Sequence, residues 1–240
     1  MQSPFPVELT QFTGALFLLA VFAILVFRFT RTRSAEERFA GELEAARVVQ
    51  QVLVPDNIPA IPGFQIQSVY KPAGQAGGDF SQVLPLADGG LLAVIGDVSG
   101  KGMPAAMNRR MLARSHGGFT TCLVLRCDAD GKLTIANAGH IAPYIAGKEL
   151  PLENGLPLGL SADTTYAESC FQLAPGLQLT LLTDGVVEAR DKAGAVLGFE
   201  RSAALSGESA DQIAKTGELF GQDDDITVLT LSYGDVPASA

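Results

Sequence analysis

Short apolar runs separated by turn signals dominate the chain from Pro55 onward. Turn-forming pairs such as Asp88-Gly89, Asp130-Gly131 and Pro175-Gly176 bound several of them. Runs of about four to eight residues between such signals are typical of buried or half-buried strands. We therefore predict strands at Phe64–Tyr70, Leu91–Ile95, Phe119–Arg126, Lys132–Ala136, Phe171–Leu173, Leu177–Thr183 and Ile226–Leu231.

Helical segments are few in the same part of the chain. The pattern predicts them at Pro104–Arg114, near Arg201–Leu205 and at Ser209–Phe220. Strands that dominate, with a few helices grouped between them, are typical of an α+β domain built in layers. We assign this domain to residues 56–234 and expect residues 235–240 to form a flexible tail.

The N-terminal part differs, because Phe12–Phe27 is almost wholly apolar. Its length is near the short end of the roughly 20 residues that a membrane span needs. Three arginines follow it, whereas Glu8 is the charged residue before it. By the positive-inside rule, residues 1–33 form a membrane anchor, with a transmembrane helix at about 11–28 and the rest of the chain in the cytoplasm. The predicted location is the inner (cytoplasmic) membrane.

A second N-terminal helix is predicted at residues 34–55. Ser34 and Glu37 have the spacing of a capping box, and Pro55 ends the helix. The apolar positions recur three or four residues apart and form one stripe: Phe39, Leu43, Ala46, Val49 and Leu53. A stripe this short favours packing onto the chain's own domain, and a homodimer through this linker helix is the alternative, since sustained coiled coils need more heptads.

Composition excludes some classes of partner. The formal net charge is −9 and the pI is about 4.7. A nucleic-acid partner is therefore not expected, because phosphate contacts need a basic face. The three cysteines (Cys122, Cys127 and Cys170) form no Cys-x-x-Cys pair, and we predict buried, reduced thiols.

The strongest chemical signal follows the predicted strand Leu91–Ile95. The sequence Gly96–Gly102 reads Gly-Asp-Val-Ser-Gly-Lys-Gly. It is not a nucleotide-phosphate loop, because three residues rather than four separate Gly96 from Gly100, and glycine follows the lysine. Asp97 is either a satisfied carboxylate at a turn or part of a larger site.

Other acidic stretches favour the larger site. Asp79 follows two glycines, Asp184 follows the run Leu179–Thr183, and Asp223-Asp224-Asp225 precedes the run that begins at Ile226. Carboxylates at the ends of strands can converge although they lie far apart in sequence. Oxygen ligands of this kind suit Mg²⁺ or Mn²⁺, and bound cations would offset the repulsion between the carboxylates.

Five motifs, in this order, resemble the SpoIIE-type (RsbU-like) branch of the bacterial metal-dependent PPM serine/threonine phosphatases. They are Gly77-Gly78-Asp79-Phe80, Gly96–Gly102 with Pro104-Ala105-Ala106-Met107, Asn137-Ala138-Gly139-His140, Thr183-Asp184-Gly185-Val186 and Asp224-Asp225-Ile226-Thr227. The resemblance covers roughly residues 45–232. It implies a PPM-like β-sandwich with helices on both outer faces and two metal ions at one end.

The resemblance also implies roles for individual residues. Asp97 would bridge two Mn²⁺ or Mg²⁺ ions with the Val98 carbonyl as a second ligand, Asp79 would join one ion, and Asp184 and Asp224 would join the other. A water held between the ions would attack the phosphate in line, with no covalent protein intermediate.

Neighbouring residues of these motifs have plainer interpretations. We expect Asp225 to face solvent or to bond to a loop, and Lys101 to decorate its turn rather than to neutralise phosphate. Ser99 occupies the place where many eukaryotic relatives have a histidine proposed as general acid. His140, with Asn137 and Gly139, is expected to be a structural hydrogen-bonding residue rather than a catalytic one.

One departure from the family pattern separates two hypotheses for function. Family members have a long helical hairpin where this chain has Asn108–Gly118, so one helical layer would be shortened and apolar surface exposed. The first hypothesis is a membrane-tethered phosphatase acting on phosphoserine or phosphothreonine of a regulatory partner, by family analogy an anti-sigma-factor antagonist. The second is a docking protein with weak or no activity.

Overall fold

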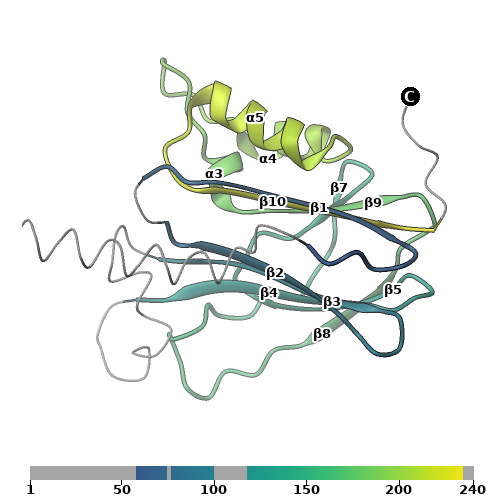
Figure 1. Cartoon of the computed structure of the whole chain (residues 1–240). Helices are drawn as coiled ribbons and strands as arrows, with labels where there is room; N and C mark the ends of the chain where they lie inside the picture. The colour runs from purple at the N-terminus through teal and green to yellow at the C-terminus, as the bar shows by residue number, and fades with distance from the viewer. Residues whose placement is uncertain (1–57, 75–76, 100–117, 235–240) are drawn as a thin grey trace, which may run out of the picture. The chain divides into compact units, whose positions relative to one another are not determined.

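Two antiparallel sheets packed face to face form the body of the molecule (Figure 1). The computed structural model describes residues 58–74, 77–99 and 118–234. Sheet A has the order β1-β10-β9-β6-β7 and sheet B the order β2-β3-β4-β5-β8. The architecture confirms the predicted layered β-sandwich.

The strands of each sheet come from distant parts of the chain. Sheet A consists of β1 (Phe64–Lys71), β6 (Tyr144–Ile145), β7 (Lys148–Glu149), β9 (Gln178–Leu182) and β10 (Ile226–Tyr233). Sheet B consists of β2 (Asp79–Pro85), β3 (Leu91–Val98), β4 (Thr120–Cys127), β5 (Lys132–Ala138) and β8 (Glu168–Gln172). All neighbouring strands pair antiparallel.

The core between the sheets follows from side-chain alternation. In β3, Leu91, Ala93 and Ile95 are buried, whereas the intervening Leu92 and Val94 are partly exposed. Because alternate side chains of a strand point to opposite faces, the odd-numbered positions of β3 face sheet A. The register continues this inward row across sheet B, where Ile95 lies opposite Leu123. This cluster is the main hydrophobic core.

Helices cover the outer face of sheet A (Figure 1). They are α3 (Asp184–Val187), α4 (Gly198–Leu205) and α5 (Ala210–Gly221). The side chain of Ser209 caps α5 by accepting a hydrogen bond from the Gln212 backbone N–H. A second apolar cluster, including Ile213 of α5 and Val228 of β10, fixes this layer to the sheet.

The outer face of sheet B contains apolar side chains that remain accessible. Leu84 is 45% exposed and Val124 is 36% exposed. Within the described ranges, helices cover only the opposite sheet. The resemblance implied helices on both outer faces, so this part of the expectation is not met by the described residues. The shortened segment Asn108–Gly118 lies outside them, apart from Gly118.

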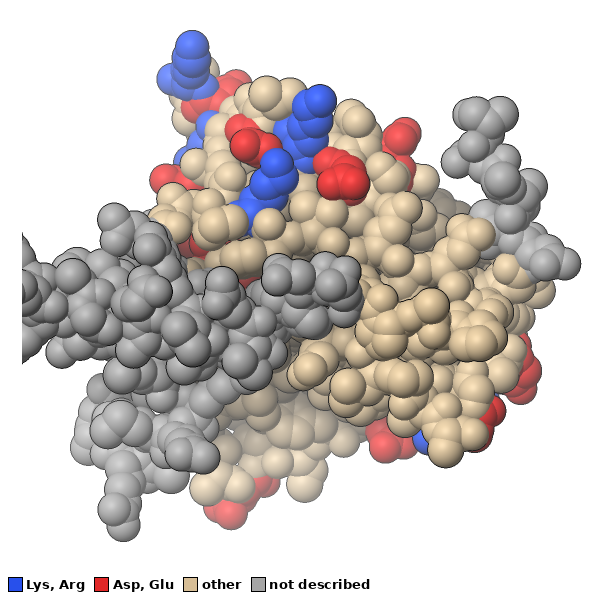
Figure 2. Space-filling model, viewed as in Figure 1, with Lys and Arg blue, Asp and Glu red and all other residues tan. Residues whose placement is uncertain are grey.

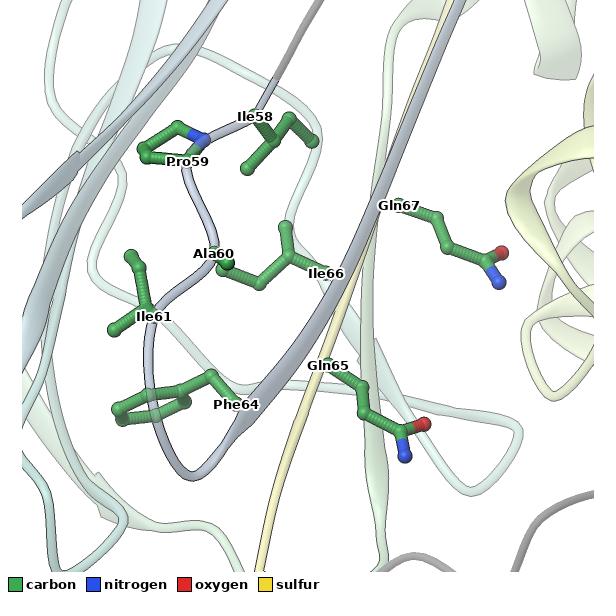
Figure 3. Close-up of a pocket in the computed structure, with 8 residues that line it drawn as sticks. All are labelled: Ile58, Pro59, Ala60, Ile61, Phe64, Gln65, Ile66 and Gln67. Carbon is green, nitrogen blue, oxygen red and sulfur yellow. The ribbon is translucent and has the colours of Figure 1, made fainter.

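Charged side chains gather over the helical layer at the top of the view, and the sandwich below it is largely uncharged on this side (Figure 2). A shallow pocket of about 360 Å³ lies where the described chain begins. Ile58 and Ile66 face it, whereas Gln65 and Gln67 point to the other side of β1 (Figure 3). Its eight lining residues include no titratable group, so it is not the candidate catalytic site.

The structure differs from the sequence-based predictions at some strands and at one cysteine. Strand β2 was not predicted, and β3 extends to Val98, so Asp97 lies within a strand rather than after it. Cys122 and Cys127 are buried as predicted, but Cys170 is exposed on the edge strand β8.

No helix of the described part is long and apolar enough to cross a membrane. The predicted anchor and linker helices lie outside the described residues and stay predictions.

Candidate active site

The candidate site begins where the apolar core of sheet B gives way to polar side chains. Asp79 of β2 lies directly opposite Asp97 of β3, which lies opposite Thr121 of β4. Directly opposed residues project from the same face of a sheet, with Cβ atoms about 4.5–5.5 Å apart. This row occupies the inward face, two residues beyond the buried row that contains Ile95 and Leu123. The structure therefore brings Asp79 and Asp97 together, as predicted.

Asp79 connects the two sheets. Its Oδ2 accepts hydrogen bonds from the hydroxyls of Thr183, at 2.7 Å, and Thr227, at 2.6 Å. Thr183 follows β9 and Thr227 lies on β10, so both donors come from sheet A. Burial raises the pKa of Asp79 well above its ordinary value, because the two hydroxyl hydrogen bonds offset only part of the desolvation.

Asp97 lies in a crowded, negatively charged environment. Desolvation, followed by repulsion from Asp184, Asp224 and Asp225, raises the pKa of Asp97 to about 7. Asp184 is the first residue of α3, and burial followed by repulsion from Glu188 and Asp224 raises its pKa. The carboxylates that the sequence singles out are thus electrostatically coupled in the folded chain.

Gly78 allows the backbone to pass close to this charged group. A Cβ atom on Gly78 would lie 2.5 Å from Asp97 Oδ1 and 2.6 Å from the Val98 carbonyl oxygen. Separations below 3.0 Å force something to move. The Val98 N–H also donates to the Gly78 carbonyl, at 3.1 Å. Two of the predicted metal ligands therefore border a space that only glycine leaves open.

Asp225 has a structural task that its neighbour Asp224 lacks. Asp225 is buried, and its carboxylate accepts hydrogen bonds from the backbone N–H groups of Ala73, at 2.8 Å, and Gly78, at 2.7 Å. It therefore bonds to the loop before β2, one of the two predicted outcomes, and does not face solvent. Asp224 is exposed beside it.

His140 is a buried residue that contacts Thr121, the residue opposite Asp97. Its Nδ1 lies 3.0 Å from Thr121 Oγ1, and its backbone N–H donates to Asn137 Oδ1 at 2.8 Å. Burial lowers the pKa of His140 to about 4, and a weaker interaction with the Leu182 backbone opposes this shift. Its Nε2 has no hydrogen-bond partner of good geometry among the described residues. A neutral, buried, hydrogen-bonded imidazole agrees with the structural role predicted for it.

The donor chemistry of the site fits a hard divalent cation. The available groups are carboxylate oxygens and a backbone carbonyl, the ligands that Mg²⁺ and Mn²⁺ prefer. As they stand, no three carboxylate, histidine or cysteine side chains of the described ranges converge closely enough to hold an ion. Repulsion between carboxylates acts over longer distances than direct bonds to a metal ion. The raised pKa of Asp97 is therefore compatible with carboxylates that do not converge on one point. The assignment of Asp79, Asp97, Val98, Asp184 and Asp224 as ligands remains a prediction.

Sequence analysis missed three threonines at the site. Thr183 and Thr227 donate hydrogen bonds to the Asp79 carboxylate, and Thr121 Oγ1 lies within hydrogen-bond distance of His140 Nδ1. Two of them belong to motifs already quoted, immediately before Asp184 and two residues after Asp225. Their position next to these motifs could have indicated a role at the site. Their hydrogen-bond partner, Asp79, can be identified only from the folded structure. Lys101 lies outside the described residues.

Comparison with known proteins identifies a family and two similar sequences. The family model described as Stage II sporulation protein E (SpoIIE) matches residues 106–234, more than half of the chain. Phosphoserine phosphatase RsbU of Bacillus subtilis is 27% identical over 195 residues, covering 68% of this chain and 58% of RsbU. Protein IcfG of Synechocystis is 28% identical over 219 residues, covering 67% and 34%. The chain thus spans about a third and somewhat over half of these two relatives.

Solved structures share the fold. The SiaA-PP2C domain of Pseudomonas aeruginosa matches 83% of this chain and 99% of that domain, with 21% identity and a TM-score of 0.64. The RsbU and RsbW domains of Rv1364c from Mycobacterium tuberculosis match 73% of this chain and 61% of that chain, with 24% identity and a TM-score of 0.57. Both likenesses establish the PP2C-type sandwich.

The close approach at Gly78 leads to a first prediction. Gly78→Ala should push Asp97 or the Val98 carbonyl out of place and destabilise the protein by about 1–3 kcal/mol. Any activity that depends on Asp97 should fall by at least about tenfold, since small displacements in a site are costly. Thermal melting and turnover should be measured beside Gly74→Ala, because a Cβ at Gly74 meets nothing within 4 Å. Equal behaviour of the two variants would contradict the prediction.

The raised pKa of Asp97 leads to a second prediction. The folded chain retains a proton on Asp97 up to about pH 7, whereas the unfolded chain releases it near 3.8. The resulting stability is fully present below the lower value and lost as pH rises through about 7. Without divalent metal, the melting temperature should therefore fall between pH 5 and pH 8.

Asp97→Asn, which stays neutral, should weaken that pH dependence and melt a few degrees higher than the parent at pH 8. Asp79 and Asp184, whose pKa values are also raised, should retain part of the slope. Asp163→Asn, at an exposed position, is the matched control. An unchanged pH dependence in Asp97→Asn would show that Asp97 is not the titrating group.

Proposed function

Because the chain belongs to the SpoIIE family, we propose that it is a metal-dependent serine/threonine protein phosphatase whose reaction takes place at the Asp79–Asp97 row. One observation supports this most directly: Asp97, Asp184 and Asp224 are coupled at one end of the sandwich, although they lie in three separate motifs. The coupled carboxylates favour an ion-binding site over a purely structural one.

The residues of this chain would share the work as follows. Asp97, Asp79, Asp184 and Asp224, with the Val98 carbonyl, would hold two Mn²⁺ or Mg²⁺ ions. When bound, such ions lower the pKa of a coordinated water and neutralise charge on a phosphoryl group. Thr183 and Thr227 would orient the Asp79 carboxylate, and Asp225 would hold the loop that contains Gly78.

Protonation of the leaving group has no assigned side chain. Ser99 Oγ accepts a hydrogen bond from the Phe119 backbone N–H, at 2.8 Å, so this hydroxyl already has a fixed structural contact. His140, whose pKa is lowered to about 4, is neutral at pH 7 and is a poor general acid. We infer that solvent supplies the proton to the departing serine or threonine oxygen.

The proposed substrate is a phosphorylated regulatory protein. The relative RsbU is a phosphoserine phosphatase, which supports phosphoserine as the group that is hydrolysed. Assignment to an anti-sigma-factor antagonist rests on family analogy alone.

Metal dependence is the decisive test. The full chain, purified in mild detergent, should hydrolyse a chromogenic phosphate ester and a phosphoserine peptide with Mn²⁺ or Mg²⁺, and excess chelator should abolish turnover. Asp97→Asn should lower kcat by at least about 100-fold, because one of the carboxylates that would hold the ions is lost.

Asp223→Asn provides a matched control, because Asp223 is an exposed member of the same acidic run. Full turnover in chelator, or an active Asp97→Asn, would contradict the proposed mechanism. Absence of turnover in the parent chain under every metal condition would instead favour the docking protein without activity.

We also propose that residues 1–33 anchor the chain in the inner membrane, with the phosphatase domain in the cytoplasm. The apolar run Phe12–Phe27 and the arginines after it support this proposal. A reporter enzyme fused after Ala240 should be active only in the cytoplasm, and the chain should stay with membranes in carbonate. Release by carbonate would contradict a spanning helix.

A further inference from the structure

The outer face of sheet B carries four neighbouring apolar side chains. Leu84 lies directly opposite Leu92 on the next strand, and Val94 lies directly opposite Val124. Leu92 and Val94 are two residues apart on β3, so they point to the same face, away from the core that the alternate residues of β3 form. We call these four residues the sheet B patch. Leu84 is 45% and Val124 is 36% exposed, and the other two are partly exposed. Contiguous apolar surface of this kind is typical of an interaction site.

A cluster of ion pairs borders the sheet B patch. Arg126 lies opposite Leu92 and continues the row that begins at Leu84. Its guanidinium donates to Asp128 at 2.7 Å and to Asp88. The cation offsets part of the charge of these two carboxylates, in a chain whose net charge is −9. Two copies of this acidic chain therefore repel each other less at this face than their net charge indicates.

The outer face of sheet B is larger than a short helix can cover. The sheet has five strands, and β3 has eight residues. At about 4.8 Å between strands and about 3.3 Å per residue, the face has an area of about 600 Å². The helix predicted at Pro104–Arg114, outside the described residues, would be about 16 Å long and about 10 Å wide. Such a helix would cover about a quarter of the face and leave the rest available to another molecule.

A second copy of this chain suits the sheet B patch. The face of a sheet can pack on an identical face about 10 Å away around a two-fold axis, because each copy then offers the same surface to the other. The available area of about 600 Å² per copy lies at the low end of the range for specific complexes. We propose that this chain forms a weak symmetric dimer through the sheet B patch. Anchoring in one membrane, as proposed above, would raise the local concentration of the copies and strengthen the dimer.

The proposed dimer leaves the candidate active site open. Asp79, Asp97 and Thr121 alternate with the outward residues of their strands and project toward sheet A. The sheet B patch and the carboxylate row therefore lie on opposite faces of sheet B. Dimerisation can thus be tested without measuring activity, and the inference is independent of the proposed phosphatase function.

The oligomeric state of the full chain in mild detergent tests the inference. Sedimentation equilibrium should show monomers that become dimers as the protein concentration rises from about 1 to 100 μM, as expected for an interface of this size. Leu84→Lys with Val124→Lys should raise the dimer Kd at least about tenfold, because apolar burial is lost and like charges are added in both copies. Leu177→Lys with Leu219→Lys, at two leucines exposed outside this face, should leave the Kd unchanged.

Cys170 reports whether the face itself becomes covered. It is exposed and lies opposite Thr134 on the outer face of sheet B. Its alkylation by a maleimide, followed by mass spectrometry, should slow over the same range of protein concentration in which the dimer forms. Alkylation should stay fast in the variant with lysines at the sheet B patch.

Other outcomes would overturn the inference. A chain that stays monomeric across this concentration range has no such interface. A dimer that persists in the lysine variant, or that forms without protecting Cys170, uses another surface such as the predicted linker helix. Slow alkylation at every concentration means that residues of the same chain cover the face. If the lysine variant does not melt cooperatively, Leu84→Gln with Val124→Thr replaces it, and the same outcomes decide.

Discussion

The hydrogen bonds between Asp79 and the two threonine hydroxyls of sheet A hold the sandwich closed at the end where like charges accumulate. Apolar packing fixes the rest of the sheets, but it stops one row before the carboxylates. Beyond that row, repulsion among Asp97, Asp184 and Asp224 would drive the sheets apart. The two short hydroxyl contacts of Asp79 Oδ2 oppose this separation by joining β2 to Thr183 and Thr227. The stability of the fold and the chemistry of the site therefore depend on the same contact.

Close backbone approach is the second requirement of the site. Glycines at positions 77, 78 and 185 lie where a Cβ atom would overlap the Asp97 carboxylate or part of Asp225. The loop before β2 and the chain before β10 can therefore meet closely enough for Asp225 to bind both Ala73 and Gly78. Carboxylates from separate motifs become neighbours because almost no side-chain volume separates their backbones. The glycines of the Gly-Gly-Asp and Asp-Gly motifs therefore allow close backbone packing, in addition to the role of the aspartates as possible metal ligands.

Local pattern predicted most of the strands, and the motifs singled out carboxylates that the fold brings near one another, for identifiable reasons. Strands such as β10 and β4 are long apolar runs bounded by turns, and Asp79 and Asp97 stand in recognisable motifs. Strand β2 escaped prediction because it begins with an acidic residue, ends at Pro85 and has the polar residues Ser81 and Gln82 in its middle. The roles of Thr183 and Thr227 depend on contacts across more than 100 positions of the chain, which no local pattern contains. Cys170 is exposed because it lies opposite Thr134 on the outer face of sheet B, whereas its neighbour Phe171 lies opposite the core residue Leu133.

The position of the last strand has a consequence for synthesis on the ribosome. Strand β10 lies between β1 and β9, and β1 pairs with no other strand of sheet A. During translation, β1 is made early and has no partner until residues 226–233 emerge. Because non-local pairing delays folding, the domain should close only when the chain is nearly complete. A chain that terminates before Thr227 would lack one of the two hydroxyls that hold Asp79. Premature termination would therefore leave β1 unpaired and the Asp79 carboxylate with only one of its two hydroxyl donors.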